Sequence, residues 1–151
     1  MDEALNAGDV CTRIVVVAGP RDGLAHAAAL MRSHHVGCLV VVEADTRRVV
    51  GLLTDRDIVT AVVARGLDPQ RLLVEDVMVR EVVTARPDES FIDLLRTMRR
   101  KGLRRLPVTT PSGTLLGLVT LDDALGILAE QLQFVVQAIA GEQGLERQHR
   151  P

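Results

Sequence analysis

An internal repeat constrains the fold of this chain more than any other feature. A shift of 67 residues places Pro20 on Pro87, with matching apolar residues on both sides. After the next turn the shift becomes 66, and residues 51–57 fall on residues 117–123. The lost residue lies in a turn, where a change of length does not disturb a core. The chain is therefore expected to build one structural unit twice.

The hydrophobic period changes in the same order within each copy. Short valine-rich runs are typical of strands, whereas apolar residues three and four apart are typical of helices. Each copy follows the order strand, helix, strand, strand, helix. The expected elements are strands at 14–17, 36–42 and 49–53 with helices at 24–34 and 55–66, then strands at 82–85, 105–109 and 115–119 with helices at 89–101 and from 121 onward.

The fold class that follows is α/β, in its α+β form, built from two β-α-β-β-α units. One unit of about 60 residues buries too little surface to be stably folded alone, so we expect the two sheets to pack together. We divide the chain into a first unit at 1–66, a linker at 67–80 with a short helix at 72–78, and a second unit at 81–140. The polar tail at 141–151 has nothing to bury and is expected to fray.

The last helix carries an apolar seam that is longer than one unit needs. Seam residues recur at steps of three and four, which places them along one side of the helix. Such a seam packs either on its own domain or on a helix of another subunit. The seam residues are Leu125, Leu128, Leu132, Val135 and Ile139, and Glu130, Gln131, Gln133 and Gln137 lie outside it.

Composition and charge exclude several classes of function. A net charge of -2 with no Trp, no Tyr and two Phe does not suit a nucleic-acid binder. Apolar runs such as 36–42 stop far short of the roughly 20 residues of a membrane span. The N-terminus lacks the basic start and apolar run of a signal peptide, so we expect a cytoplasmic protein in which Cys11 and Cys38 are reduced.

No catalytic signature is present in the sequence. It contains no Gly-x-Ser-x-Gly elbow, no Walker loop, no His-Glu-x-x-His and no Gly-x-Gly-x-x-Gly. Paired aspartates such as Asp122 and Asp123 point to different faces of a helix, and helix capping or sugar binding explains them more simply. We therefore expect a protein that is not an enzyme.

The motif with the most chemical content is Gly-apolar-apolar-Thr-x-x-Asp, which occurs at 51–57 and again at 117–123. In isolation, Thr followed three residues later by Asp is a capping box. The motif also lies where a strand ends and a helix begins, a position that favours phosphate. An aspartate can accept hydrogen bonds from two ribose hydroxyls, and a glycine permits close approach of the backbone.

The duplicated unit resembles a tandem pair of cystathionine beta-synthase (CBS) domains, called a Bateman module. The resemblance covers about residues 10–132 and rests on the repeated motif in its order of elements. Segments 52–59, 66–69 and 132–139 also resemble small stand-alone bacterial CBS-pair proteins, including the hypoxic response type.

This resemblance implies two units related by a pseudo-twofold axis, with clefts that bind AMP, ADP, ATP, NAD(H) or S-adenosylmethionine. It implies that Asp57 and Asp123 bind ribose hydroxyls and that Thr54 and Thr120 lie near the ribose or phosphate. It further implies a non-catalytic regulator that signals by a change of conformation or dimer state. Adenine contacts are expected from Val16, Val17, Ala18, Gly37 and Cys38 in one site, and from Val83, Thr84, Ala85, Arg105, Leu106 and Pro107 in the other.

The two copies differ where the family often places basic residues. The second copy has Arg104 and Arg105 before Pro107, whereas the first has Gly37 and Cys38 at the aligned positions. Arg56 supplies one compensating charge in the first copy, and Asp122 replaces it in the second. We therefore predict an asymmetric module, with one site that binds better than the other.

Two other readings stay open. His34, His35, Cys38 and Cys11 are residue types that bind zinc or sense oxidants, although a buried cysteine and a helix-end histidine have simpler structural roles. The third reading is a structural assembly partner with empty clefts.

For the partners we expect a homodimer and a downstream protein, and neither nucleic acid nor membrane.

Overall fold

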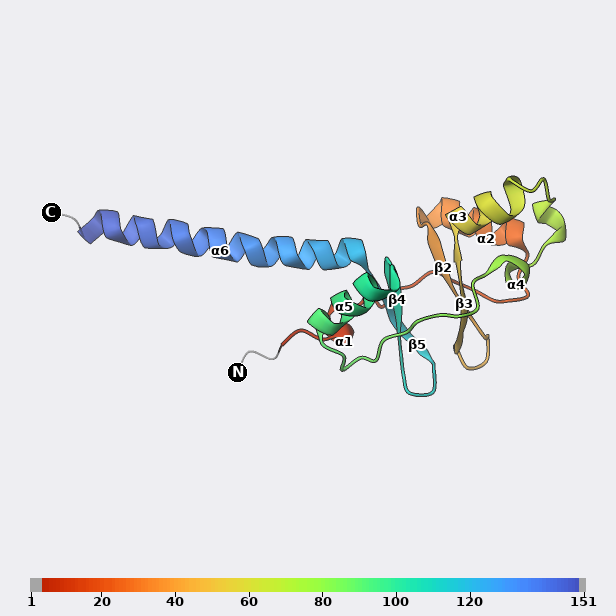
Figure 1. The fold of residues 1–151 in the computed structure, drawn as a ribbon, viewed down its shortest axis with the longest axis horizontal. Helices are drawn as coiled ribbons and strands as arrows, with labels where there is room; N and C mark the ends of the chain where they lie inside the picture. Colours follow the sequence, from red (N-terminus) through yellow and green to blue (C-terminus); the bar gives the residue numbers. More distant parts are fainter. Residues whose placement is uncertain (1–3, 150–151) are drawn as a thin grey trace.

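The computed structural model describes residues 4–149. Two small sheets stand next to each other, and one long helix extends away from them (Figure 1). The first unit contains β1 (Val17–Ala18), α2 (Leu24–His34), β2 (Cys38–Val42), β3 (Val49–Thr54), α3 (Asp55–Ile58) and η1 (Val59–Val63). The remaining elements are α1 (Ala7–Val10), η2 (Pro69–Arg71), α4 (Val74–Val77), α5 (Phe91–Lys101), β4 (Arg105–Thr109), β5 (Leu115–Thr120) and α6 (Leu121–His149).

The repeat seen in the sequence is also present in the strand register. In the first sheet β1 runs parallel to β2, and β2 pairs with β3 in the antiparallel sense. The β4–β5 hairpin pairs in the same way, so Arg105 opposite Thr120 corresponds to Cys38 opposite Thr54. Both hairpins shift register one residue before the end of their first strand. The predicted α/β fold with two similar units is confirmed.

The buried core consists of three apolar clusters. One lies in the first unit around Leu39 and Leu53, and a second lies in the other unit around Leu94 and Leu106. The third joins the two sheets, because Val40 and Val42 of β2 pack with Leu115 of β5. The two sheets were expected to pack against each other, and this third cluster is where they do so.

Each short helix ahead of a unit packs on the other unit. Ala7 of α1 belongs to the core of the second unit, whereas Val74 of α4 belongs to that of the first. The residues that follow these helices extend the hairpins, since Thr12 bridges Leu118 and an equivalent bridge joins Val79 to Leu52. Figure 1 shows α1 beside α5 and α4 beside β3. The crossed packing brings Thr12 to the second unit.

The predicted first strand of each unit is mostly wrong. Of 14–17, only Val17 pairs in a strand, and 82–85 is reduced to a bridge between Ala85 and Val108. Ile14 is 92% exposed, so its β-branched side chain reflects no burial. These segments pair with the sheet only at their ends. A composition rich in β-branched residues does not show how many residues of a segment pair.

The inner strands and helices agree with the pattern. Strand β4 spans 105–109 as predicted, and α2 spans 24–34. The helix after Thr54 forms, but it widens into the π-helical turn η1 at Val59–Val63 before Gly66 ends it at positive φ. Wide turns of this kind are rare and leave no periodic signal in a sequence.

Helix α6 is longer than predicted. The expected frayed tail is helical through His149, because residues 142–149 are mostly good helix formers and Gly141 and Gly144 stay inside the helix. Ala124 is its one buried residue in the described part of the chain. The helix is long and apolar enough to cross a membrane, with a mean hydropathy of 1.3 over its most apolar stretch. The expectation that no segment has this length is therefore wrong.

Candidate functional site

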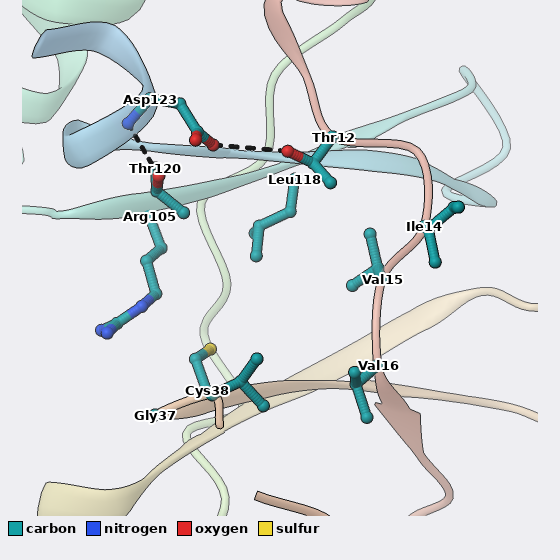
Figure 2. Close-up of a pocket in the computed structure, with 11 residues that line it drawn as sticks. Thr12, Ile14, Val15, Val16, Gly37, Cys38, Arg105, Leu118, Thr120 and Asp123 are labelled. Carbon is teal, nitrogen blue, oxygen red and sulfur yellow. Dashed lines mark hydrogen bonds between the residues drawn. The ribbon is translucent and has the colours of Figure 1, made fainter. Parts of the chain in front are cut away.

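A cleft of about 290 Å³ lies where the two sheets meet. Figure 2 shows side chains of both units pointing into it. The first unit and its lead-in supply mostly apolar groups, and the second supplies most of the polar ones. The lining residues are Thr12, Ile14, Val15, Val16, Val36, Gly37, Cys38, Arg105, Leu118, Thr120 and Asp123.

Asp123 presents its carboxylate to this cleft. The Asp123 backbone N–H donates to Thr120 Oγ1 at 3.1 Å, which caps the start of α6. The carboxylate does not complete a box with the Thr120 amide, and instead accepts a hydrogen bond from Thr12 Oγ1 at 3.4 Å (Figure 2). A bond of this length is weak, so the carboxylate can exchange it for a better donor.

Asp57 makes the opposite use of the same motif. Its N–H donates to Thr54 Oγ1 at 3.1 Å, and its Oδ2 accepts from the Thr54 N–H at 3.0 Å. This is a complete capping box, in which the carboxylate satisfies an otherwise free amide. Thr54 and Asp57 lie outside the lining of the cleft. The two aspartates predicted to bind ribose therefore differ in their carboxylate partners, and only Asp123 lines the cleft.

The charge on the cleft wall comes from the same side as Asp123. Arg105 stands at the start of β4, half-buried, and in Figure 2 its guanidinium points away from Asp123, toward the first unit. By strand register, the residue in the equivalent place beside Thr54 is Cys38. One motif thus has a cation next to it, and the other has a buried thiol.

Cys38 is a protonated thiol at neutral pH. Burial raises its pKa from 9.0 to about 11, with Arg105 opposing that shift and Asp57 and Asp55 adding to it. A thiol in this state is a poor nucleophile, since nucleophilic attack needs the thiolate. The side chain therefore serves as a small apolar wall of the cleft.

The motif glycines admit backbone from the crossed lead-in segments. A Cβ at Gly117 would come within 2.8 Å of the Thr12 carbonyl oxygen, and one at Gly51 within 3.1 Å of the Val79 carbonyl oxygen. A close approach was predicted at these glycines in connection with ligand binding. The groups that approach them are backbone carbonyls of the chain's own lead-in segments. Gly117 in this way positions Thr12 beside Asp123.

The structure assigns core positions to several residues predicted in the sites. Ala18 and Ala85 are buried in the two unit cores, and Pro107 is fully buried in β4. Arg104 lines a smaller hollow of about 80 Å³ with Arg105, Thr120, Leu121 and Asp122. Three more of the predicted site residues are also packed: Val17 in the cluster between the sheets, Val83 against the second core and Leu106 inside that core. Two are not buried, since Thr84 lies in a polar groove with Arg86 and Arg100, and Arg56 lies on the surface.

The four residues of the metal hypothesis are not clustered within residues 4–149. His34 and His35 are exposed at the end of α2, and Cys38 faces the cleft. Cys11 packs against Gly117 of the other unit. Among residues 4–149, no three His, Cys, Asp or Glu side chains are grouped as metal ligands would be.

Sequence reasoning missed five residues of the cleft. The sequence analysis assigns the adenine contacts to two sites, one for each copy of the repeat, and so places Arg105 in a different site from Gly37 and Cys38. In the structure one cleft contains all three residues. No local sequence signal identifies these residues, because the cleft forms only where the two units meet. The missed residues are Thr12, Ile14, Val15, Val36 and Leu118.

Comparison with protein families gives a match that covers most of the chain. The model of the CBS domain matches twice, at residues 7–64 and 74–130. Hypoxic response protein 1 of Mycobacterium tuberculosis is 33% identical over 135 residues, which cover 88% of this chain and 89% of that protein. An uncharacterized protein of Methanopyrus kandleri is 32% identical over 124 residues, 82% of this chain but 63% of the relative's own length.

Solved structures share the arrangement of the two units. The crystal structure of Hypoxic Response Protein I, which has two coordinated zinc ions, has a TM-score of 0.70 at 33% identity and covers 79% of this chain and 95% of that one. The CBS domain pair of protein MJ0100, solved with 5-methylthioadenosine and S-adenosyl-L-methionine, has a TM-score of 0.75 at 22% identity, covering 85% and 99%. The chain belongs to the CBS-domain family and contains two CBS domains in tandem.

Proposed function

We propose that this chain is a non-catalytic regulatory module of the cytoplasm that binds an adenosine-containing ligand in the cleft between its units. AMP, ADP, ATP, NAD(H) and S-adenosylmethionine share the groups that such a site recognises. In this proposal the Asp123 carboxylate accepts hydrogen bonds from the ribose hydroxyls, and Arg105 meets the phosphates of a nucleotide or the carboxylate of S-adenosylmethionine. Occupancy is signalled to a downstream protein through a change of conformation or of dimer state.

The observation that carries the proposal is the orientation of Asp123. Its carboxylate faces an open cleft and is held by one long hydrogen bond from Thr12, so it remains available to a ligand. Val15, Val16 and Val36 give the cleft an apolar wall of the kind that a purine ring needs. A volume of about 290 Å³ is at the small end of the range for small-molecule sites.

The proposal assigns one working site to each chain. Asp57 uses its carboxylate to cap α3, and the residue beside it at the Arg105 position is the neutral Cys38. A ligand at that position would share the carboxylate with the Thr54 amide and would find no cation from β2. The Asp123 side of the module is therefore the side that binds.

Thermal unfolding followed by calorimetry tests this function, with AMP, ATP, NADH and S-adenosylmethionine added separately. A ligand at a hundred times its Kd adds about 2.7 kcal/mol to the free energy of unfolding. For a domain of this size that corresponds to a rise in Tm of about 5 to 10 °C. We expect such a rise with at least one of the four ligands, and its loss in Asp123→Ala.

Asp57→Ala is the matched control, because it removes the same group from the same motif. We expect its Tm without ligand to fall, since a helix cap is lost, while the rise caused by ligand is retained. A ligand-induced rise lost equally in both variants would contradict the single-site proposal. If none of the four ligands raises the Tm, the nucleotide function is wrong, and a shift with zinc instead would favour the metal reading.

A further inference from the structure

The two motif aspartates start their helices in equivalent backbone surroundings. In each copy the aspartate N–H donates to the motif threonine at 3.1 Å. In each copy a lead-in residue also pairs with the hairpin through two backbone hydrogen bonds, of 2.9 and 3.0 Å between Thr12 and Leu118 and of 2.8 and 3.0 Å between Val79 and Leu52. The shift of 67 residues that relates the copies places Thr12 on Val79. The different hydrogen bonds of the two carboxylates therefore come from the side chains around them.

The hydroxyl of Thr12 is a side-chain group that one copy has and the other lacks. It donates to Asp123 Oδ2 at 3.4 Å from the lead-in segment of the first unit (Figure 2). Val79 has a side chain of the same shape but no donor, and the Asp57 carboxylate accepts from the Thr54 amide instead. The carboxylate thus bonds to the lead-in where the lead-in has a hydroxyl, and to its own helix start where it does not.

Arg105 is another difference between the two surroundings, since Cys38 occupies its place in the first unit. A cation beside Asp123 would attract the carboxylate away from the start of its helix. In Figure 2, however, the guanidinium points away from Asp123 and toward the first unit. The contact that accounts for the open capping box is therefore the one with Thr12.

The backbone holds the Thr12 hydroxyl at the edge of the cleft. Its two hydrogen bonds to Leu118 fix the residue beside β5. It fits there because Gly117 has no side chain, and a Cβ at that position would come within 2.8 Å of the Thr12 carbonyl oxygen. Thr12 and Asp123 both line the cleft, whereas Asp57 does not. A carboxylate that bonds to this hydroxyl is therefore turned to where a ligand can reach it.

We propose that Thr12 is a positioning residue, which draws the Asp123 carboxylate away from the start of α6 and toward the cleft. Val79 lacks the hydroxyl and leaves Asp57 in its capping box. The orientation of the carboxylate follows from contacts within the chain, whereas its effect on binding rests on the proposed function.

Hydrogen exchange of the Thr120 amide, measured by NMR on the full chain without ligand, tests the orientation. Thr12→Val replaces the hydroxyl by a methyl group, so the Asp123 carboxylate is expected to turn back and accept from the Thr120 N–H. Exchange of this amide should then slow about two- to tenfold, the range that one net hydrogen bond gives. Thr12→Ser keeps the hydroxyl and should exchange as wild type does. A loss of packing alone would speed the exchange instead of slowing it.

Val79→Thr is the reciprocal variant, because it gives the first unit the hydroxyl that it lacks. Asp57 should then leave its capping box, and exchange of the Thr54 amide should become about two- to tenfold faster. The variant keeps Asp55 and Arg56, the residues between the motif Thr and Asp, so it separates the effect of the hydroxyl from that of these neighbours. Val79→Ile is the control, since it adds no donor and should leave the Thr54 amide unchanged.

Titration calorimetry with AMP, ATP, NADH and S-adenosylmethionine measures the effect on binding. In Thr12→Val the orientation that binds becomes a minor population, so the Kd is expected to rise about two- to tenfold, with Thr12→Ser at the wild-type value. If none of the four binds to wild type, the proposed function fails, and the two amides still decide the role of Thr12. A Thr120 amide that exchanges no more slowly in Thr12→Val than in wild type overturns the proposal, as does a Kd that Thr12→Val leaves unchanged.

Discussion

The two aspartates of the repeated motif show how one residue type acquires two roles. Asp57 closes a capping box, whereas Asp123 leaves its box open and accepts from Thr12, a residue 111 positions earlier. A local pattern predicts the cap in both copies equally well. It cannot predict the difference, because the deciding contact comes from the lead-in of the other unit.

Arg105 is predicted to select for phosphate in the cleft. Arg105→Gln keeps a polar side chain of similar reach and removes the charge, so binding of AMP is expected to weaken tenfold or more, given about 1.5 to 3 kcal/mol for a charged hydrogen bond. Binding of adenosine, which has no phosphate, should hardly change. Titration calorimetry with both ligands measures the difference. Arg104→Gln, one residue away and exposed, is the control, and an equal loss in both variants would contradict the role of Arg105.

The pKa of Cys38 predicts a loss of stability at alkaline pH. Burial raises this pKa from 9.0 to about 11, so below pH 9 the thiol is protonated in the folded and unfolded chain alike. Between pH 9 and 11 the unfolded chain releases its proton first, and the free energy of unfolding falls by about 2 to 3 kcal/mol. The chain has no Tyr, and Lys101 is its one Lys, so few other groups titrate in this range.

Urea unfolding followed by far-UV circular dichroism at pH 8.5 and pH 11 measures that loss. Cys38→Ala should lose about 2 to 3 kcal/mol less than wild type over this range, because the shifted group is gone. Cys11→Ala is the control and should behave like wild type. The same alkaline loss in Cys38→Ala would show that its thiol is not the responsible group.

At the scale of elements, agreement with the sequence follows how much of each element is buried. Strands β2 and β4 contain almost only buried residues and lie close to their predicted bounds. The segment 14–17 has the same β-branched composition but lines an open cleft, so composition overstated its pairing. Apolar periodicity reports burial, and it fails where a segment lines an open cleft instead of a core.

The ends of the equivalent helices α2 and α5 give a prediction about stability. His35 ends α2 with φ 54, and Gly102 ends α5 with φ 64. Glycine adopts this left-handed conformation without strain, whereas histidine does not. His35→Gly is therefore expected to raise the free energy of unfolding by about 0.5 to 1 kcal/mol, measured by urea unfolding. Gly102→Ala should lower it by about 1 kcal/mol, and a His35→Gly protein no more stable than wild type would contradict this account.

At the scale of the whole molecule, the crossed lead-ins make the two units one assembly. Ala7 and Val74 are each buried in the core of the other unit, so neither unit is complete alone. The repeat predicted two similar units, as found, and the predicted difference in binding between the two sites stays a prediction. It did not predict the crossing, because a repeat gives the order of elements and leaves open which copy each one packs on.

The central claim is that one cleft per chain binds an adenosine-containing ligand. Isothermal titration calorimetry with whichever of AMP, ATP, NADH and S-adenosylmethionine raises the Tm tests it most directly, because the heat of binding needs no aromatic reporter in a chain without Trp or Tyr. The account predicts a single transition at one ligand per chain, absent in Asp123→Ala and retained in Asp57→Ala. Two equivalent sites per chain, or binding that survives in Asp123→Ala, would contradict it.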